Sequence, residues 1–243
     1  MVERLNGFMV EGLNRNLIIL EKAKTKLNNT IQLLTNLSPF QPINHSTVLI
    51  IGVFHGDEPQ GKYLIEKYLF QEIYPPLDGN NNLIFIPCLN PDGMQNNTRI
   101  NANSVDLNRN FPTKNWGQDG SDAGENPKDY YGGKAPASEI ETQFVIDIIE
   151  KYQPKLILTL HAPYKIVNYD GPAHDIAQKI SEIINYPVEP SIGYPTPGSF
   201  GTYCGVERNI PTITLELDEE ISVEQLEQPV FGIFDMLNEI NFS

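Results

Sequence analysis

Cysteine is scarce in this sequence: its 243 residues include two cysteines, Cys88 and Cys204. Two thiols are too few for a disulfide-stapled scaffold, and they are too few for a zinc site built on cysteine. Both of those classes are therefore excluded. We expect the two cysteines to be plain thiols.

Positive charge is also in short supply. Lys and Arg together number 17 against 31 Asp and Glu, which gives a formal net charge of -14 at pH 7. Binding to the phosphates of nucleic acid needs clustered basic residues, so we expect no nucleic-acid partner. An anionic membrane surface is disfavoured for the same reason.

Long hydrophobic runs are missing as well. No segment approaches the roughly 18 consecutive apolar residues that a membrane-spanning helix requires. The N-terminus lacks the basic head and unbroken apolar core of a secretion signal. The sequence therefore predicts a protein without membrane insertion and with a cytoplasmic location.

The chain has no internal repeat and no Ser/Gly-rich linker, and its 40% hydrophobic content allows one sizeable core. Four apolar runs have the length of strands buried on both faces, as in a largely parallel sheet: residues 47–53, 83–87, 156–160 and 212–217. Helical patterns alternate with them or follow them, at residues 60–72, 138–152, 175–184 and 223–240. This order predicts a single α/β domain with a central mixed, largely parallel sheet flanked by helices. The Gly- and Pro-rich segment 112–137 is expected to form a long surface loop.

Polar side chains follow each of the four predicted strands. His55 and Glu58 follow the first, the segment NPDG at 90–93 follows the second, His161 ends the third, and Glu216 lies near the end of the fourth. Ligands of open α/β sheets bind outside the carboxyl ends of the strands. These side chains therefore predict a functional site at that edge.

Two histidines and a glutamate in this set match a common catalytic zinc site, which leaves a fourth position for water. His55 and Glu58 lie three residues apart in a turn that carries Gly and Pro, so both can face one ion, and His161 would join them from a neighbouring strand. A single histidine at a strand end is more often structural. The zinc site is predicted because His55, Glu58 and His161 occur together. His45 and His174 have polar surroundings and are expected at the surface.

A metal-activated water needs a base, and Glu216 is the available carboxylate. Its apolar neighbours predict a confined position that raises its pKa, although a strand-end glutamate can also face solvent. Arg99 and Arg109 lie in NNTRINANSVDLNRNFP, which has no packing periodicity. They suit a substrate carboxylate or a developing oxyanion, and surface salt bridging is the alternative.

These motifs resemble those of the M14-type zinc carboxypeptidases over about residues 47 to 220. HGDE at 55–58 is similar to the HxxE motif, LHAP at 160–163 carries the third ligand, and TLEL at 214–217 carries the general base. NPDG at 90–93 followed by Arg99 matches the segment with the oxyanion-stabilising arginine. DLNRNF at 106–111 looks like the Asn-Arg pair that binds a terminal carboxylate, here Asn108 and Arg109.

The resemblance implies a zinc carboxypeptidase-like fold with one Zn²⁺ per chain, held by His55, Glu58 and His161. Glu216 and Arg99 would be catalytic. It also divides the single domain into an N-terminal lead-in segment (1–45), a motif-bearing catalytic core (46–220) and a C-terminal helix (221–243).

A narrower resemblance concerns the substrate. NYDGPA at 168–173 and GYPTPGSFGTYCG at 193–205 look like segments of the bacterial murein peptide amidases, which are cytoplasmic and cut the γ-D-glutamyl to diaminopimelate bond of cell-wall tripeptide. This implies a small cell-wall peptide as partner. The family's mobile tyrosine has three candidates, Tyr164, Tyr194 and Tyr203, and Tyr194 is preferred because it precedes a Pro-Gly turn.

Three alternatives stay open at this stage. One is an N-acyl amino acid deacylase of the aspartoacylase type, against which the NPDG segment and the GYPTPGSFG loop argue. Another is a general metallocarboxypeptidase. The last is an inactive module that binds cell-wall peptides, which is expected to lack the base or the arginine. The oligomeric state is not predicted.

Overall fold

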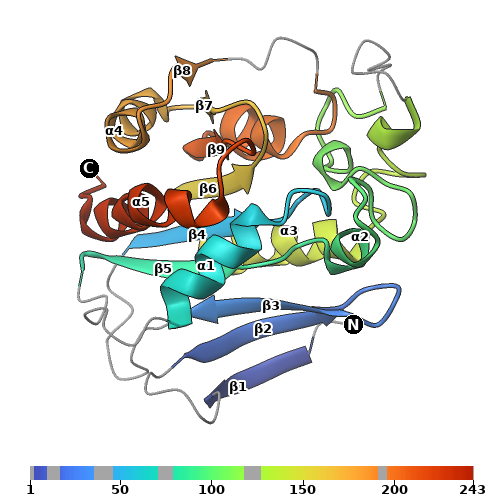
Figure 1. Cartoon of the computed structure of the whole chain (residues 1–243). Coiled ribbons are helices and arrows are strands. Elements are labelled where there is room, and N and C mark those ends of the chain that lie inside the picture. The colour runs from blue at the N-terminus through green and yellow to red at the C-terminus, as the bar shows by residue number, and fades with distance from the viewer. Residues whose placement is uncertain are drawn as a thin grey trace.

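A single sheet organises the chain (Figure 1). The computed structural model describes residues 3–9, 17–35, 46–70, 79–117, 127–190 and 196–242. Within these ranges nine strands follow the order β1-β2-β3-β5-β4-β6-β9-β7-β8. Their bounds are β1 (Glu3–Met9), β2 (Ile18–Lys24), β3 (Thr30–Thr35), β4 (Ser46–Gly52), β5 (Asn81–Ile86), β6 (Leu156–His161), β7 (Ile166–Asp170), β8 (Val188–Glu189) and β9 (Thr212–Glu216).

The centre of the sheet is parallel. The four central strands, in the order β5-β4-β6-β9, are parallel to one another. On one side β3 is antiparallel to β5 and is followed by the antiparallel strands β2 and β1, and on the other side β7 is antiparallel to β9. Every residue of β5 and β6 is buried, as expected for strands covered on both faces. The predicted fold class, an α/β domain with a central mixed, largely parallel sheet, is confirmed.

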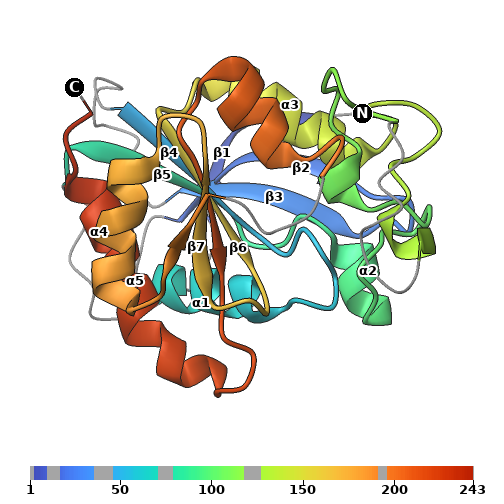
Figure 2. The same ribbon diagram turned by 90° about the horizontal axis from the view of Figure 1, so that it is seen from above.

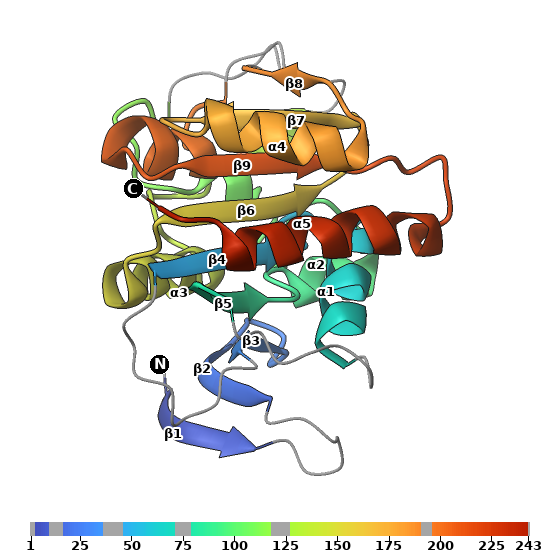
Figure 3. The same ribbon diagram turned by 90° about the vertical axis from the view of Figure 1, so that its left-hand side faces the viewer.

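Helices cover both faces of the sheet (Figures 2 and 3). One apolar cluster joins the sheet to α1 (Gln60–Phe70), α4 (His174–Ile184) and α5 (Glu227–Glu239). A second cluster joins the opposite face to α3 (Ile140–Tyr152) and to the short π-helical segment η3 (Thr202–Val206). The short helix α2 (Pro91–Asn96) and the 3-10 turns η1 (Leu107–Arg109), η2 (Pro127–Tyr130) and η4 (Val223–Leu226) complete the described elements.

The four predicted core strands are present, with ends that shift by one or two residues. The helix predicted at 60–72 is α1, whose last two predicted positions lie outside the described residues. The helix predicted at 223–240 is divided into η4 and α5. Six elements were not predicted, because their sequence patterns are short or interrupted by polar residues: β1, β2, β3, β7, β8 and α2.

Three of the missed strands come from the predicted lead-in segment. β1, β2 and β3 extend the sheet beside β5, and buried Glu21 in β2 pairs with Lys151 at the end of α3. A charged residue that is buried with a partner from a distant helix is invisible to a local apolar pattern. The division of the chain at residues 45 and 220 stays a prediction.

Both cysteines are free and buried. Burial raises the pKa of Cys88 to about 12, which makes its thiol a poor nucleophile. Among the described residues, no helix combines the length and the apolar character needed to cross a bilayer.

Candidate active site

The site begins where β4 ends. Val53 follows the strand with a φ of 56°, in the left-handed region that a β-branched residue rarely adopts. The backbone there is held by the neighbouring segment, because Asn90 N donates to Val53 O at 2.9 Å and Leu89 N donates to Gly52 O at 3.0 Å. This turn redirects the chain so that the following residues, including His55, reach the carboxyl edge of the sheet.

Two glycines allow the turn to contact α2. A Cβ built on Gly56 would lie 2.0 Å from the carbonyl carbon of Gly93, so no larger residue fits without moving backbone. Asn90 in turn accepts a hydrogen bond from Gly93 N at 2.9 Å and caps α2. The motifs HGDE and NPDG are therefore in direct backbone contact.

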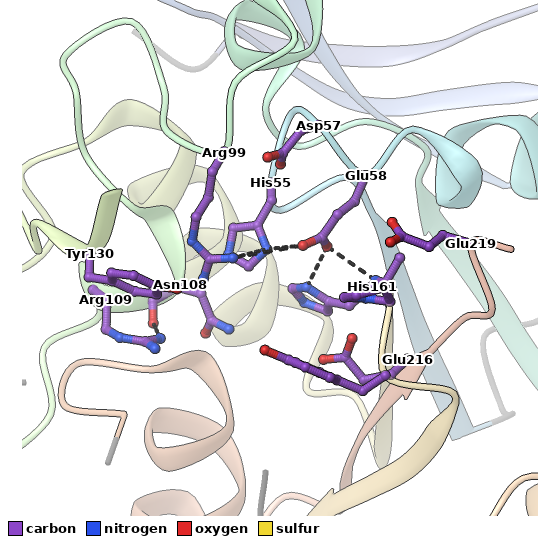
Figure 4. A pocket seen from close by; sticks show the side chains of 13 residues that line it. His55, Asp57, Glu58, Arg99, Asn108, Arg109, Tyr130, His161, Glu216 and Glu219 are labelled. Carbon is purple, nitrogen blue, oxygen red and sulfur yellow. Dashed lines mark hydrogen bonds and ion pairs between the residues drawn. The ribbon is translucent and has the colours of Figure 1, made fainter. Parts of the chain in front are cut away.

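Glu58 lies between two imidazoles (Figure 4). Its Oε1 is 2.7 Å from His55 Nδ1, and its Oε2 is 3.0 Å from His161 Nδ1. One ligand atom from each of the three side chains lies within 4.8 Å of the others. A donor set of two histidines and one glutamate at this spacing fits a zinc ion. Of the other histidines, His45 lies outside the described residues and His174 is exposed on α4.

The charge of Glu58 is matched to its surroundings. Burial alone raises the pKa of its carboxyl, but the nearby His55 and the hydrogen bonds from both imidazoles outweigh burial and hold the pKa well below its usual range. Glu58 is therefore an anion in the folded protein, as a metal-binding carboxylate must be.

Asp106 supports both His55 and Arg99. Its Oδ1 is 3.3 Å from His55 Nε2, while Arg99 Nε and Nη2 donate to Oδ2 at 3.1 and 3.0 Å. Asp106 is fully buried; burial raises the pKa of its carboxyl, but Arg99 and His55 more than offset this and hold the pKa far below normal. If Nε2–H of His55 donates to Asp106, Nδ1, which contacts Glu58 Oε1 in this structure, is the nitrogen that would bind a metal. Asp106 belongs to the motif DLNRNF, but no sequence pattern predicted a role for it.

Glu216 faces His161 from the adjacent strand. The two residues pair in the parallel ladder of β6 and β9. Glu216 is 6% exposed, and no described residue donates a hydrogen bond to its buried Oε2. Burial raises the pKa of this carboxyl, and His161 only partly opposes the effect. An acceptor oxygen without a protein donor beside the histidines is suited to take a proton from water.

Two arginines lie at the other side of the site. Arg109 Nη1 donates to Asn108 O at 2.7 Å, but Nη2 is buried and no described residue accepts from it. Asn108 Oδ1 accepts from Phe200 N at 2.9 Å, which orients the Asn108 side chain. The Tyr130 ring contacts both guanidinium groups, with its centre 4.9 Å from Cζ of Arg99 and 5.7 Å from that of Arg109.

Tyr130 was also missed, because it lies in the loop predicted at residues 112–137. No local pattern marks it. Tyr130 can be recognised only in the folded protein, where its ring in η2 lies against the guanidinium groups of Arg99 and of Arg109 in η1.

The candidates for the family's mobile tyrosine lie at different places in the fold. Tyr203 is buried in the core at 3% exposure, with Arg208 over its ring, whereas Tyr164 lines the cavity. Tyr194, the predicted residue, lies outside the described residues, so its role stays a prediction.

One cavity of about 290 Å³ is lined by the three candidate metal ligands, by Glu216 and Arg99, and by Asn108 and Arg109. Arg99, Arg109 and Tyr130 lie on one side, and the carboxylates of Glu216 and Glu219 lie on the other (Figure 4). The cavity can therefore hold a carboxylate at one end while a reacting bond lies beside Glu216.

Comparisons with known proteins agree on a family. The sequence profile described as "Zinc carboxypeptidase" matches residues 23–177. Murein peptide amidase A of Escherichia coli (strain K12) is 32% identical over 206 residues, which cover 82% of this chain and 82% of that protein. Murein peptide amidase A of Vibrio campbellii is 41% identical over 186 residues, which cover 74% and 72%. The crystal structure of murein-tripeptide amidase MpaA from Escherichia coli O157 aligns with a TM-score of 0.74 at 28% identity, over 90% of this chain and 91% of that one.

Proposed function

This chain belongs to the zinc carboxypeptidase family, and from that premise we propose that it hydrolyses the γ-D-glutamyl to diaminopimelate bond of murein tripeptide. The family and its relatives make the chain a hydrolase with zinc as cofactor. The bond and the roles of individual residues are the proposal.

His55, Glu58 and His161 would hold the zinc ion. The fit rests on their donor atoms, which lie within 4.8 Å of one another, and on Asp106, which can accept the Nε2 proton of His55. When bound, zinc lowers the pKa of water toward about 7 and polarises a carbonyl oxygen.

The observation that carries the proposal is the guanidinium group of Arg109, a residue that lines the same cavity and whose buried Nη2 has no acceptor among the described residues. A buried guanidinium nitrogen without an acceptor is costly, and a substrate carboxylate would satisfy it with a charge-assisted hydrogen bond. Arg109 and Asn108 would anchor the terminal carboxylate of the peptide. The bond to be cut is then the amide that joins the terminal residue to the rest.

Two residues act on that amide. Arg99, held on Asp106 by two hydrogen bonds, donates to the carbonyl oxygen as negative charge develops there. Glu216 removes a proton from the attacking water, and the carbon–oxygen bond forms. The carbon–nitrogen bond then breaks, and Glu216 returns the proton to the departing amine. The products are a new carboxylate and a free amino acid.

Two sets of observations favour the murein peptide. The Escherichia coli and Vibrio campbellii relatives bear the name murein peptide amidase, and the segments at 168–173 and 193–205 resemble that group. The cytoplasmic location stays a prediction.

The test is mass spectrometry of the products after the zinc-loaded protein is incubated with L-Ala-γ-D-Glu-meso-diaminopimelate. Release of free diaminopimelate is expected. Since Arg109 is proposed to anchor the terminal carboxylate, the same peptide amidated at that carboxylate should not be cut. Turnover of N-acyl amino acids with an intact tripeptide would instead indicate a deacylase. An unchanged tripeptide in the presence of bound zinc would rule out the proposed bond.

A further inference from the structure

The motif NPDG contains a fully buried acid, Asp92 of α2, that takes no part in the proposed reaction. Its Oδ1 accepts from Thr25 Oγ1 at 2.6 Å and from Asn29 Nδ2 at 2.8 Å, and its Oδ2 accepts from Leu27 N at 3.0 Å. All three donors belong to the turn that joins β2 to β3. One carboxylate therefore ties α2 to a turn that lies 63 to 67 residues earlier in the chain.

The turn between β2 and β3 is shaped for this contact and lies next to α2 (Figure 1). Thr25 N donates to Asn29 O at 3.0 Å, and Thr25 Oγ1 accepts from Asn29 N at 3.1 Å. Asn28 takes a φ of 66°, a left-handed conformation that asparagine tolerates. Thr25 is only 6% exposed, although turns usually lie at the surface. The turn thus directs its hydrogen-bond donors toward Asp92.

The same turn also contacts the chain on both sides of Arg99. Asn29 Nδ2 donates to Gln95 Oε1 at 3.0 Å, and Lys26 Nζ donates to Ala102 O at 3.1 Å. Gln95 precedes Arg99 and Ala102 follows it, so the turn supports both ends of the segment that carries this arginine.

Backbone contacts link α2 to the active site. Asn90, the N-cap of α2, donates from Nδ2 to Phe54 O at 3.3 Å and to Arg99 O at 3.2 Å. Gly56 N donates to the same Arg99 carbonyl at 3.3 Å. His55 lies between Phe54 and Gly56 in the chain. The positions of His55 and Arg99 therefore depend on where α2 lies.

The hydrogen bonds of Asp92 leave its own helix. An acid in the first turn commonly stabilises the N-terminus of the helix that carries it. Here Asn90 caps that end by accepting from Gly93 N, whereas the described donors to Asp92 come from the turn between β2 and β3. The carboxylate consequently joins two segments, and hydrogen bonds to a charged acceptor are among the stronger ones in a protein.

We propose that Asp92 positions the active site: it locks the turn between β2 and β3 onto α2 and so fixes where His55 and Arg99 lie. The inference rests on the proposed function for the roles of these two residues. Asp92 touches neither the substrate nor the reacting atoms, so it is a positioning residue. In this role the N-terminal hairpin supports catalysis as well as extending the sheet.

Asp92→Asn tests the proposal, because asparagine keeps the shape but replaces one acceptor oxygen by an NH₂ group, which would face the donor Leu27 N or Asn29 Nδ2. Zinc affinity, measured by competition against a chromophoric chelator, should fall by about 10-fold, the lower end of the cost of losing a supporting group. The kcat for murein tripeptide should fall by up to about 100-fold, as expected when a reacting group is misplaced. KM should change little, because the substrate is anchored by Arg109.

Glu21→Gln is the matched control. Glu21 lies in the same hairpin, on β2, but pairs with Lys151 of α3. Its loss should lower the midpoint of thermal unfolding and leave zinc affinity and kcat at the wild-type values. Equal falls in zinc affinity and kcat in Glu21→Gln and Asp92→Asn would indicate a general loss of stability and overturn the proposal. Unchanged zinc affinity and kcat in Asp92→Asn would overturn it as well.

A second pair of variants decides the question if Asp92→Asn does not fold. Thr25→Ser keeps the hydroxyl group that donates to Asp92, whereas Thr25→Val keeps the shape and loses the donor. Thr25→Ser should bind zinc as tightly as the wild type, and Thr25→Val should bind it more weakly. Equal zinc affinities of the two variants contradict the role of Asp92.

Zinc affinity also separates this inference from the proposed bond, since it is measured without substrate. If the wild type does not cut murein tripeptide but zinc affinity falls in Asp92→Asn and not in Glu21→Gln, the murein proposal fails and the role of Asp92 stands. Cleavage of the tripeptide by the wild type and Asp92→Asn at equal rates, with equal zinc affinities, has the reverse meaning.

Discussion

Glu216 and His161 lie side by side as the last register pair of the parallel strands β9 and β6, and Leu217 N donates to His161 O at 2.7 Å just beyond them. The pairing places a carboxylate next to a proposed metal ligand, and both residues lie on strands and not on loops. A backbone ladder sets this distance, so it is insensitive to motion of the surrounding loops.

Glu216→Gln should therefore separate catalysis from metal binding. Glutamine keeps the shape but cannot accept a proton from water, so we expect kcat to fall by about 10² to 10⁴-fold, the scale of general acid–base help. Zinc content, measured by atomic absorption, should stay at one ion per chain. Glu220→Gln, at an exposed position, is the matched control. Full turnover by zinc-loaded Glu216→Gln would remove Glu216 from the mechanism.

Asp106→Asn should weaken zinc binding. The amide cannot pair as a charge with Arg99 and orients His55 less well, and loss of such a supporting carboxylate typically costs about 10- to 100-fold in metal affinity. Competition against a chromophoric chelator measures the affinity. Asp175→Asn serves as the control. An unchanged zinc affinity would show that Asp106 serves Arg99 alone.

Gly56→Ala should destabilise the protein near the site. The added methyl group would meet the backbone of Gly93 at 2.0 Å, and backbone cannot rotate away as a flexible side chain can. We expect a loss of about 1 to 3 kcal/mol in the free energy of unfolding, as for other overpacked sites, together with weaker zinc binding.

Gly232→Ala in α5 is the comparison for Gly56→Ala. Its nearest neighbour, Ile183 Cγ2, is at an ordinary contact distance of 3.5 Å, and alanine favours the helix. The midpoint of thermal unfolding should fall for Gly56→Ala. For Gly232→Ala it should stay at the wild-type value or rise. Equal stability of Gly56→Ala and wild type would contradict the close approach of the two motifs.

Glu141 should make the protein less stable as pH rises. Burial, with the nearby Glu139, raises the pKa of Glu141 from 4.5 to about 7. Between these two values the folded state binds a proton that the unfolded state has lost, so the free energy of unfolding decreases as pH increases through the window. The stabilising effect of the proton is complete below pH 4.5 and is lost above about 7.

Glu141→Gln should remove this contribution, because the amide does not titrate. The free energy of unfolding, measured by urea denaturation, should differ less between pH 5 and pH 8 in Glu141→Gln than in the wild type. The gain of the variant over the wild type should therefore be larger at pH 8 than at pH 5. Glu150→Gln, exposed on the same helix α3, should retain the wild-type difference. An identical pH dependence in Glu141→Gln and wild type would show that Glu141 does not titrate in this range.

Much of the fold was predictable because the central strands are continuous apolar runs. β4, β5, β6 and β9 are buried on both faces, so their sequences need no partner to be recognised. The outer strands differ. β7 carries Asn168, which donates to Glu189 O, and Asp170, and β2 carries Glu21, which pairs with Lys151, so polar residues interrupt the apolar pattern.

The family motifs predicted which residue types belong to the site, and the structure shows how His55, Glu58, His161 and Glu216 meet at one edge of the sheet. Asp106 and Tyr130 could not be found in the same way. Each acts on groups brought to it by other segments: Asp106 lies between His55 and Arg99, and Tyr130 lies against two guanidinium groups. Their local sequences carry no periodicity that distinguishes them from loop residues.

The amino-acid sequence by itself determined the chemistry available to this protein: two histidines and acids at strand ends, arginines in an Asn-rich loop, and an apolar framework to hold them. Only the tertiary structure decided which carboxylates are neutralised and which are not. Two imidazoles lower the pKa of Glu58, and Arg99 with His55 lowers that of Asp106, whereas burial outweighs the neighbouring groups at Glu216 and raises its pKa. The reason is physical: charge compensation depends on distances across strands and loops that lie far apart in the chain.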